Sequence, residues 1–287
     1  MDKSELHALI SLLDDPDEEV FKQICVKLMS MGADVIPALE SAWENSFDSV
    51  IQNRIENIIQ KIQFDKINRD LKEWARPENQ DLLEGALIVA KYQYPDLDED
   101  KLRRQIAQVK QDIWLELNNN LTALEKVRVI NHIIFDVHGF SGNTTNYHAP
   151  QNSYINNVLE TKKGNPLSLS VIYAVIAQDL RIPVYGVNLP DHFILAYVEH
   201  SNAISGHDLG DRVLFYINPF SRGWVVSRKE IDAFLKQQRL DPRPEYYDPC
   251  SNLDIIRRLL RNLIHSYEKL GYPNKVEELS SMLLSLA

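Results

Sequence analysis

The segment from residue 166 to residue 180 constrains the fold of this chain more than any other. Its sequence, Pro-Leu-Ser-Leu-Ser-Val-Ile-Tyr-Ala-Val-Ile-Ala-Gln-Asp-Leu, has the length of a helix and carries apolar side chains on nearly every side. A helix without a polar face is buried, because every side of it must be covered. We therefore predict a central helix in which Ala174 and Val175 are fully buried, with other elements packed around it.

Short stretches with the composition of β-strands follow this segment. Residues 183–189, 192–200 and 212–217 are rich in Val, Ile, Tyr and Phe and are separated by turn residues, and residues 223–227 are a candidate fourth strand. Apolar runs bounded by turn signals are typical of strands. Beside one buried helix, they indicate an α+β fold that is mainly helical, with a small antiparallel sheet packed against that helix.

Helical periodicity covers most of the remaining chain. Helices are predicted at residues 6–13, 20–31, 33–43, 48–74, 82–92, 98–117, 122–137, 227–238, 253–270 and 274–284. Asp15 is the predicted N-cap of the second helix, with Pro16 at its first position. Residues 140–157 lack periodicity and are predicted to form a long loop, and long loops often carry function.

The distribution of these elements suggests three parts. Residues 1–76 are predicted to form a helical region, residues 77–241 a central domain, and residues 242–287 a proline-rich linker followed by a helical hairpin. In the first part, Leu-Leu-Asp-Asp-Pro-Asp-Glu-Glu-Val precedes a helix, and Gly32 and then Val-Ile-Pro-Ala-Leu follow that helix. This pattern resembles a HEAT-type helical repeat, which cannot bury both of its faces alone and so implies packing on the rest of the chain or on a partner. An ordinary helical bundle is the alternative.

Charge and cysteine content exclude several classes of protein. The 287 residues carry a net charge of −10, which argues against a nucleic-acid-binding protein. No signal peptide is evident at the start, and no apolar stretch is long enough to cross a membrane. Cys25 and Cys250 match no metal or redox spacing and fit a reducing compartment. We expect a cytoplasmic protein without membrane or nucleic-acid partners.

The sequence also gives no support for a metal or a cofactor. His132 and His138 are six positions apart and do not share a helix face, and His148 lies in the predicted loop. Gly164 is the only glycine near the start of the buried helix, so no phosphate-binding loop is predicted there. We expect neither a metal site nor a bound cofactor.

Several separate blocks of sequence point to one family. After the apolar helix come Arg-Ile-Pro-Val-Tyr-Gly-Val, His-Phe-Ile-Leu-Ala-Tyr-Val and Tyr-Ile-Asn-Pro-Phe, in that order. A further block precedes the apolar helix and includes its first residues: Asn-Ser-Tyr-Ile-Asn-Asn-Val-Leu-Glu-Thr-Lys-Lys-Gly-Asn-Pro-Leu-Ser-Leu-Ser. Residues 80–287 thereby resemble the transglutaminase-like fold of papain-type cysteine hydrolases. The resemblance is closer to the bacterial SirB-one type, whose C-terminal helices are tetratricopeptide-like.

The resemblance implies positions for a catalytic site. In this family a Cys opens the buried helix, a His opens a strand, and an Asp or Asn ends the next strand. The Cys position falls at Pro166, which carries no nucleophile, whereas His192 matches the general base and Asn218 its orienting residue. Ser168 and Ser170 are weak substitutes for the thiol, because Ser168 faces another side of the helix and Ser170 lies one turn deeper.

Each of these residues also has a purely structural interpretation. Asn165 is a good helix N-cap, and Pro166 suits the first helical position. The two serines could bond backbone carbonyls of the buried helix. His192 and Asp191 could belong to a hydrogen-bonded surface turn, and Asn218 precedes a proline, a pair that favours turns.

Two functions follow from these residues. The first is a non-catalytic transglutaminase-like protein that binds a protein or peptide, with Asn165 and Asp191 as binding residues beside His192. The second is a hydrolase or transferase that acts on amide bonds through an unusual nucleophile or a water activated by His192. For either, we expect the Asn218 side chain to accept a hydrogen bond from one ring nitrogen of His192, which leaves the other nitrogen facing Pro166.

Overall fold

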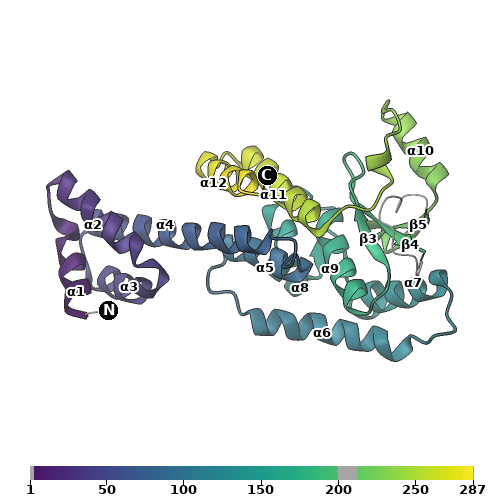
Figure 1. Ribbon diagram of the computed structural model, residues 1–287, viewed down its shortest axis with the longest axis horizontal. Helices are drawn as coiled ribbons and strands as arrows, with labels where there is room; N and C mark the ends of the chain where they lie inside the picture. The colour runs from purple at the N-terminus through teal and green to yellow at the C-terminus, as the bar shows by residue number, and fades with distance from the viewer. Residues whose placement is uncertain (1–2, 200–211, 287) are drawn as a thin grey trace. The chain divides into compact units, whose positions relative to one another are not determined.

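The computed structural model describes residues 3–199 and 212–286. The chain divides into two compact units, Met1–Glu73 and Trp74–Ala287. Figure 1 shows the elements of both.

The first unit contains helices around one apolar core. They are α1 (Lys3–Ser11), η1 (Leu12–Asp14), α2 (Glu18–Ser30), η2 (Gly32–Val35), α3 (Ile36–Asn45) and α4 (Ser49–Trp74), whose last residue opens the second unit. The buried side chains of the core come from every one of these elements: Leu6, Leu13, Ile24, Leu28, Val35, Leu39, Ile55, Ile58 and Ile62.

The start of α2 differs from the prediction. Asp17, not Asp15, is the N-cap, and its side chain accepts a hydrogen bond from the backbone N–H of Glu19. The side chain of Asp15 accepts a hydrogen bond from the N–H of Asp17 at 2.8 Å. Asp15 therefore shapes the turn before the helix. Asp15 and Asp17 are equivalent N-cap candidates by residue type, so the sequence alone did not distinguish them.

The second unit is mainly helical. Its helices are α5 (Leu82–Gln93), α6 (Glu99–Glu116), α7 (Ala123–Asn131), the π-helix η3 (His132–Val137), η4 (Pro150–Ser153), α8 (Ile155–Thr161), α9 (Pro166–Asp179), η6 (Pro219–Ser221), α10 (Arg228–Gln237), η7 (Pro244–Tyr246), α11 (Asn252–Leu270) and α12 (Pro273–Leu284). Figure 1 shows α9 between α6 on one side and α11 on the other, and both helices contact it.

The helix α9 is buried as its sequence predicts. Every residue from Pro166 to Ala177 is buried, with Ala174 0% and Val175 4% exposed. The helices α5, α6, α8 and α11 contact it, and so do the strands β3 and β4. This arrangement confirms an α+β fold in which a buried helix supports a small sheet.

The sheet is an antiparallel meander. Its strands β3 (Val184–Val187), β4 (Ile194–Val198), β5 (Val213–Asn218) and β6 (Trp224–Val226) pair in the order of the chain. Leu195 of β4 pairs with both Gly186 of β3 and Ile217 of β5, and Ile217 pairs with Val225 of β6. A separate parallel pair joins β1 (Ser141–Gly142) to β2 (Lys163–Gly164) just before α9.

Two segments differ from the prediction, one predicted as a loop and one predicted as a regular helix. The predicted loop at residues 140–157 contains β1, η4 and the start of α8, because a seven-residue helix rich in Asn carries little periodic signal. The predicted helix at residues 122–137 is α7 followed by the wider π-helix, in which the N–H of His138 reaches the carbonyl of Ile133 at 2.9 Å. The wider turn keeps three consecutive residues buried, Ile133, Ile134 and Phe135.

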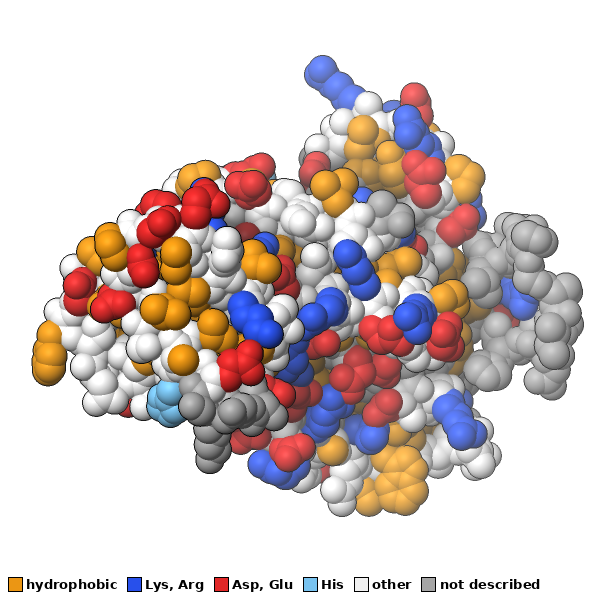
Figure 2. Space-filling view, turned by 60° about the vertical axis from the view of Figure 1, so that its left-hand side comes forward, with side chains coloured by type: hydrophobic (Ala, Val, Ile, Leu, Met, Phe, Trp, Pro, Cys, Tyr) orange, Lys and Arg blue, Asp and Glu red, His pale blue; other side chains and the backbone are white. Residues whose placement is uncertain are grey.

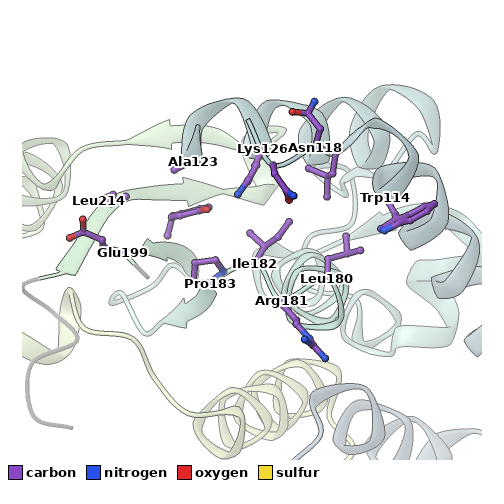
Figure 3. Close-up of a pocket in the computed structure, with 13 residues that line it drawn as sticks. Trp114, Asn118, Ala123, Lys126, Leu180, Arg181, Ile182, Pro183, Glu199 and Leu214 are labelled. Atoms are coloured by element: carbon purple, nitrogen blue, oxygen red, sulfur yellow. The ribbon is translucent and has the colours of Figure 1, made fainter. Parts of the chain in front are cut away.

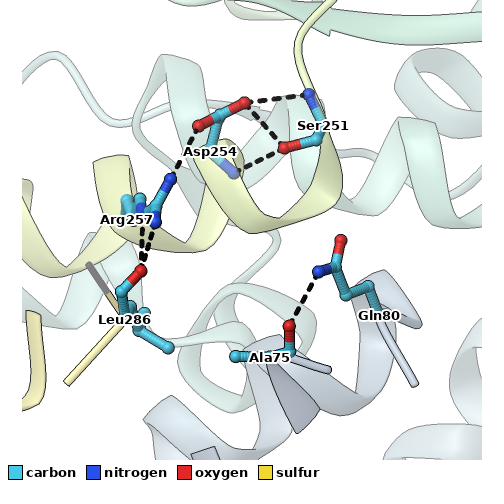
Figure 4. A network of polar contacts seen from close by, with 6 residues as sticks. All are labelled: Ala75, Gln80, Ser251, Asp254, Arg257 and Leu286. Atoms are coloured by element: carbon cyan, nitrogen blue, oxygen red, sulfur yellow. Dashed lines mark hydrogen bonds and ion pairs between the residues drawn. The ribbon is translucent and has the colours of Figure 1, made fainter. Parts of the chain in front are cut away.

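The C-terminal hairpin, α11 and α12, is tied together by polar contacts (Figure 4). Ser251 and Asp254 form a capping box at the start of α11. The Arg257 guanidinium bonds the Leu286 carbonyl oxygen and lies 3.3 Å from the Asp254 carboxylate. Figure 4 also shows Gln80, whose side-chain amide donates to the Ala75 carbonyl oxygen at 2.8 Å in the segment before α5.

The surface mixes charges of both signs. Figure 2 shows Asp and Glu side chains interspersed with Lys and Arg side chains over the visible face, with smaller groups of hydrophobic side chains among them. Among the described residues, no helix has both the length and the apolar character needed to cross a membrane.

Candidate functional site

A cavity of about 300 Å³ lies at the start of α9. Four segments wall it: the loop between β1 and η4, the first turn of α9, the turn before β4, and α11. Its lining includes Pro166 and His192, two positions that the family resemblance assigns to the catalytic site. The binding candidates Asn165 and Asp191 also line it.

The first turn of α9 is held rigidly. Asn165 is the N-cap, and its side-chain oxygen accepts a hydrogen bond from the N–H of Ser168 at 2.8 Å. Its side-chain amide donates to the hydroxyl of Ser153 at 2.9 Å. Pro166 occupies the first helical position, where a missing N–H costs nothing. The residue in the family's nucleophile position is therefore part of a fixed helix start.

The two serines of this helix bond the backbone. The Ser168 hydroxyl accepts from the N–H of Asn165 at 3.0 Å and donates to the Asn165 carbonyl oxygen at 3.3 Å. The Ser170 hydroxyl donates to the Pro166 carbonyl oxygen at 2.7 Å. Both residues are buried, and the cavity lining includes neither of them. Their hydroxyl groups thus serve the helix, as the structural interpretation of the sequence expected.

His192 is exposed and precedes the sheet. The strand β4 begins at Ile194, so His192 belongs to the turn before the strand rather than opening it. Its backbone N–H donates to the Leu189 carbonyl oxygen at 3.2 Å, and its ring packs edge-on against the ring of Phe234 at 5.0 Å between centroids. His192 and Pro166 both line the cavity, so the position that the resemblance assigns to the base and the position it assigns to the nucleophile share one site.

Asn218 does not make the contact that we expected. Its side-chain oxygen accepts hydrogen bonds from the backbone N–H groups of Phe220 at 3.1 Å and Ser221 at 3.3 Å. The residue thereby caps η6 at the end of β5, which is the turn chemistry that an Asn-Pro pair favours. Asn218 is also outside the set of described residues that line the cavity.

Arg258 is one of the residues of this cavity that the sequence did not indicate. It lies on α11 near Arg257 and Arg261, and only Arg261 of the three is exposed. Arg258 is half-buried and lines the cavity. Burial lowers the pKa of its guanidinium, and Arg261 lowers that pKa further, whereas Asp191 and Tyr147 raise it.

A polar stripe on α11 was the available signal. Arg258, Asn262 and His265 are spaced at i, i+4 and i+7, which places them on one face of a helix. Ser266 completes this face, and all four residues line the cavity. This stripe borders the buried apolar side of α11, which includes Leu259. It indicated that part of the helix faces a polar space rather than core or solvent.

Two lining residues, His148 and Tyr147, contact basic and aromatic neighbours. His148 lies with its Nε2 3.2 Å from the Nζ of Lys269, and its ring is 6.1 Å from the ring of His265. Tyr147 packs edge-on against Phe220 at 5.9 Å between centroids. Burial raises the pKa of the Tyr147 hydroxyl.

The other histidines singled out from the sequence lie elsewhere. His132 is 3.1 Å from the Asp136 carboxylate, and His138 is 2.8 Å from the Asp112 carboxylate. Across residues 3–199 and 212–286, no group of three or more His, Cys, Asp or Glu side chains is arranged to hold a metal ion.

A larger cavity of about 600 Å³ lies at the other end of α9 (Figure 3). Leu180, Arg181, Ile182 and Pro183 line it on one side, and Figure 3 shows Lys126 reaching toward it from α7. It includes none of the residues that the resemblance assigns to the catalytic site. The smaller cavity is therefore the candidate functional site.

The fold agrees with a comparison to known protein families. The model of the transglutaminase-like superfamily matches residues 100–261, which is more than half of the chain. The chain therefore belongs to the transglutaminase-like superfamily, as its sequence blocks implied.

Its similar proteins include bacterial and animal chains. The UPF0162 protein of Xylella fastidiosa is 28% identical over 211 residues, which cover 71% of each chain. The UPF0162 protein of Vibrio cholerae is 26% identical over 183 residues, 63% of this chain and 64% of that one. F-box only protein 21 of Mus musculus is 27% identical over 154 residues, 54% of this chain and 24% of the mouse protein. No solved structure is a match.

Proposed function

We propose that this chain is a non-catalytic transglutaminase-like protein that binds a segment of a protein or peptide in the cavity at the start of α9. One observation carries the proposal: Pro166, at the family's nucleophile position, lines the same cavity as the candidate base His192. The cavity thus keeps the place of the ancestral site without the group that would form a covalent intermediate.

The neighbouring polar groups support this proposal. A substitute nucleophile would need to lie within hydrogen-bond reach of its base. The hydroxyl groups of Ser168 and Ser170 instead bond the backbone of α9, outside the cavity lining. The side-chain oxygen of Asn218, the expected orienting group, caps η6.

The lining of the cavity suits a peptide. Tyr147 and Phe193 offer apolar surface, and Asn262 and His192 offer side-chain donors and acceptors for amide groups. Ligand sites commonly combine a largely apolar wall with a few convergent polar groups.

The finer family features are also part of the proposal. We infer the SirB-one type from the block at residues 152–170, a HEAT-like repeat in the first unit, and a tetratricopeptide-like hairpin in α11 and α12. Repeats of these kinds often build binding surfaces, which fits a protein partner. We also infer a cytoplasmic location, supported by two cysteines that form no disulfide, and no nucleic-acid or membrane partner.

An enzymatic function is the second candidate. The exposed ring of His192 at the cavity could activate a water for attack on an amide bond, without a covalent intermediate. This hydrolase would cleave the bound peptide, whereas the binding module would release it intact.

The central experiment selects peptides on the full chain from a random displayed library and measures the affinity of the enriched peptides. We expect His192→Ala to weaken their binding at least tenfold, because the imidazole lines the cavity, while the free energy of unfolding changes little at this exposed position. His132→Ala, an exposed histidine away from the cavity, is the matched control and should bind normally.

Mass spectrometry of the incubated peptides separates the two candidates. Recovery of intact peptide supports the binding module. Cleavage that His192→Ala abolishes would establish the hydrolase instead, and a library without any enriched peptide would exclude the proposed binding function.

A second experiment tests the geometry at Pro166. We expect Pro166→Cys to place a thiol in the cavity that iodoacetamide alkylates at pH 7.5 at least tenfold faster than either native cysteine. Burial raises the pKa of the Cys250 thiol to about 12 and also raises that of Cys25, so both native thiols react slowly. A thiol at a helix N-terminus beside an imidazole is more reactive.

Peptide mapping by mass spectrometry measures the alkylation rate at each position. The double variant Pro166→Cys/His192→Ala should react several-fold more slowly than Pro166→Cys alone. Equal rates for the two variants would show that His192 does not act on the position that Pro166 occupies.

A further inference from the structure

Arg258 lines the cavity with a half-buried guanidinium that makes no hydrogen bond or ion pair within the described residues, 3–199 and 212–286. Arg257, one residue earlier, instead bonds the Leu286 carbonyl oxygen and Asp254. A partly desolvated guanidinium without hydrogen-bond partners is costly, because protein groups have not replaced the water that its N–H groups lost. The hydrogen-bond donors of Arg258 are thus available to a ligand.

The surroundings of Arg258 favour an anion. The cavity lining includes His148, His192 and His265, which carry either no charge or a positive one, and the side-chain amide of Asn262. The only acidic residue among the described lining residues is Asp191. This small region is therefore neutral to positive, although the whole chain carries a net charge of −10.

We propose that the cavity binds a carboxylate group of a peptide ligand, with the guanidinium of Arg258 as its partner. This inference rests on the proposed peptide-binding function and specifies the chemistry of its ligand. The carboxylate would complete the hydrogen bonds of a guanidinium that the fold leaves without a partner. The planar guanidinium can donate two parallel hydrogen bonds to the two oxygens of one carboxylate.

The carboxylate of Asp191 favours this ligand over a phosphate. Asp191 lines the same cavity, and its carboxylate raises the pKa of the Arg258 guanidinium. A phosphate dianion would meet a stronger repulsion from Asp191 than a single negative charge would. Either the C-terminal carboxylate of a peptide or an Asp or Glu side chain meets the requirement, and the experiment distinguishes the two.

The experiment titrates the full chain with four small probes and follows the Nε–Hε signal of Arg258 by NMR. The probes are N-acetyl-Ala-Gly with a free C-terminus, the same dipeptide as its C-terminal amide, N-acetyl-aspartate N-methylamide, and inorganic phosphate. We expect one or both carboxylate probes to bind at least tenfold more tightly than the amide and to shift the Arg258 signal. The free-acid dipeptide tests a C-terminal source, and the aspartate derivative tests a side-chain source.

Substitutions at Arg258 provide the second part of the experiment. Because these variants lack the Arg258 signal, binding of the probes is followed by the NMR signals of the other cavity residues. Arg258→Gln should reduce the preference for the acid over the amide to less than twofold, and Arg258→Lys should retain part of it, because lysine keeps the charge but lacks the planar guanidinium. Arg261→Gln is the matched control, since this exposed arginine on the same helix does not line the cavity, and it should retain the full preference.

The outcomes separate this inference from the proposed function. If acid and amide bind equally, or if Arg258→Gln keeps the preference, the carboxylate proposal is wrong while peptide binding stands. Tighter binding of phosphate than of both carboxylates overturns it as well. If no probe shifts the Arg258 signal, this proposal fails, and the separate peptide selection decides the proposed function.

Discussion

Val175→Asp is expected to abolish folding of the second unit. Val175 is 4% exposed in the middle of α9, among helices and strands that cover this helix. The substitution buries a carboxylate without an ion-pair or hydrogen-bond partner, which lowers the free energy of unfolding by about 4 kcal/mol or more. That cost is a large share of the roughly 5–15 kcal/mol by which domains are ordinarily stable. Near-UV circular dichroism and hydrogen exchange of the α9 and sheet peptides should both show the loss of structure.

Val137→Asp is the matched control for this prediction. It introduces the same change at a valine that is 56% exposed, and we expect the free energy of unfolding to change by about 0.5 kcal/mol or less. Native-like exchange protection of α9 in the Val175→Asp protein would show that this helix is not the core of the unit.

Gly186→Val should destabilise the same unit by about 3 kcal/mol. A Cβ atom on Gly186 would lie 2.6 Å from the ring of Phe193, 2.9 Å from Ile255 and 3.1 Å from the sulfur of Cys250. Valine adds two further methyl groups to this space, so β3 must separate from β4, from α11 or from the segment before α11. The midpoint of urea unfolding, followed by near-UV circular dichroism, measures the effect.

Gly271→Ala separates crowding from backbone strain. Gly271 has φ +75°, and a Cβ atom there would have no neighbour within 4 Å. Alanine at this position should cost only the strain of a left-handed conformation, about 1–2 kcal/mol. A smaller loss for Gly186→Val than for Gly271→Ala would contradict the tight packing at Gly186.

Periodicity predicted the core of the fold well. The buried helix was predicted at residues 166–180 and spans Pro166–Asp179, and each of the predicted strands corresponds to a strand of the sheet. These elements were predictable because burial imposes the apolar pattern directly on their sequences. The predicted strand at residues 192–200 ends beyond Val198, and its last residue lies outside the described residues.

The site was predictable only in part. Pro166 and His192 could be placed because local sequence blocks carry the family resemblance, and the structure brings both to one cavity. The side-chain oxygen of Asn218 accepts a hydrogen bond from the backbone N–H of Phe220. This is the turn that the Asn-Pro pair favours, so the local pattern predicted this side chain better than the family resemblance did. Arg258 comes from a helix far along the chain. The polar stripe on α11 indicated a polar space beside this helix, but not which other segments of the chain enclose that space.

The dependence of the cavity on α11 has a consequence for synthesis on the ribosome. The first turn of α9 and the turn at His192 emerge well before α11, which supplies the wall that contains Arg258. At about 5–20 residues per second, the delay is on the order of several seconds. During that time the nascent chain has no complete pocket, and the surfaces of α5 and α9 that α11 later covers are open to chaperones. The peptide-binding site that we propose is therefore complete only after α11 has docked.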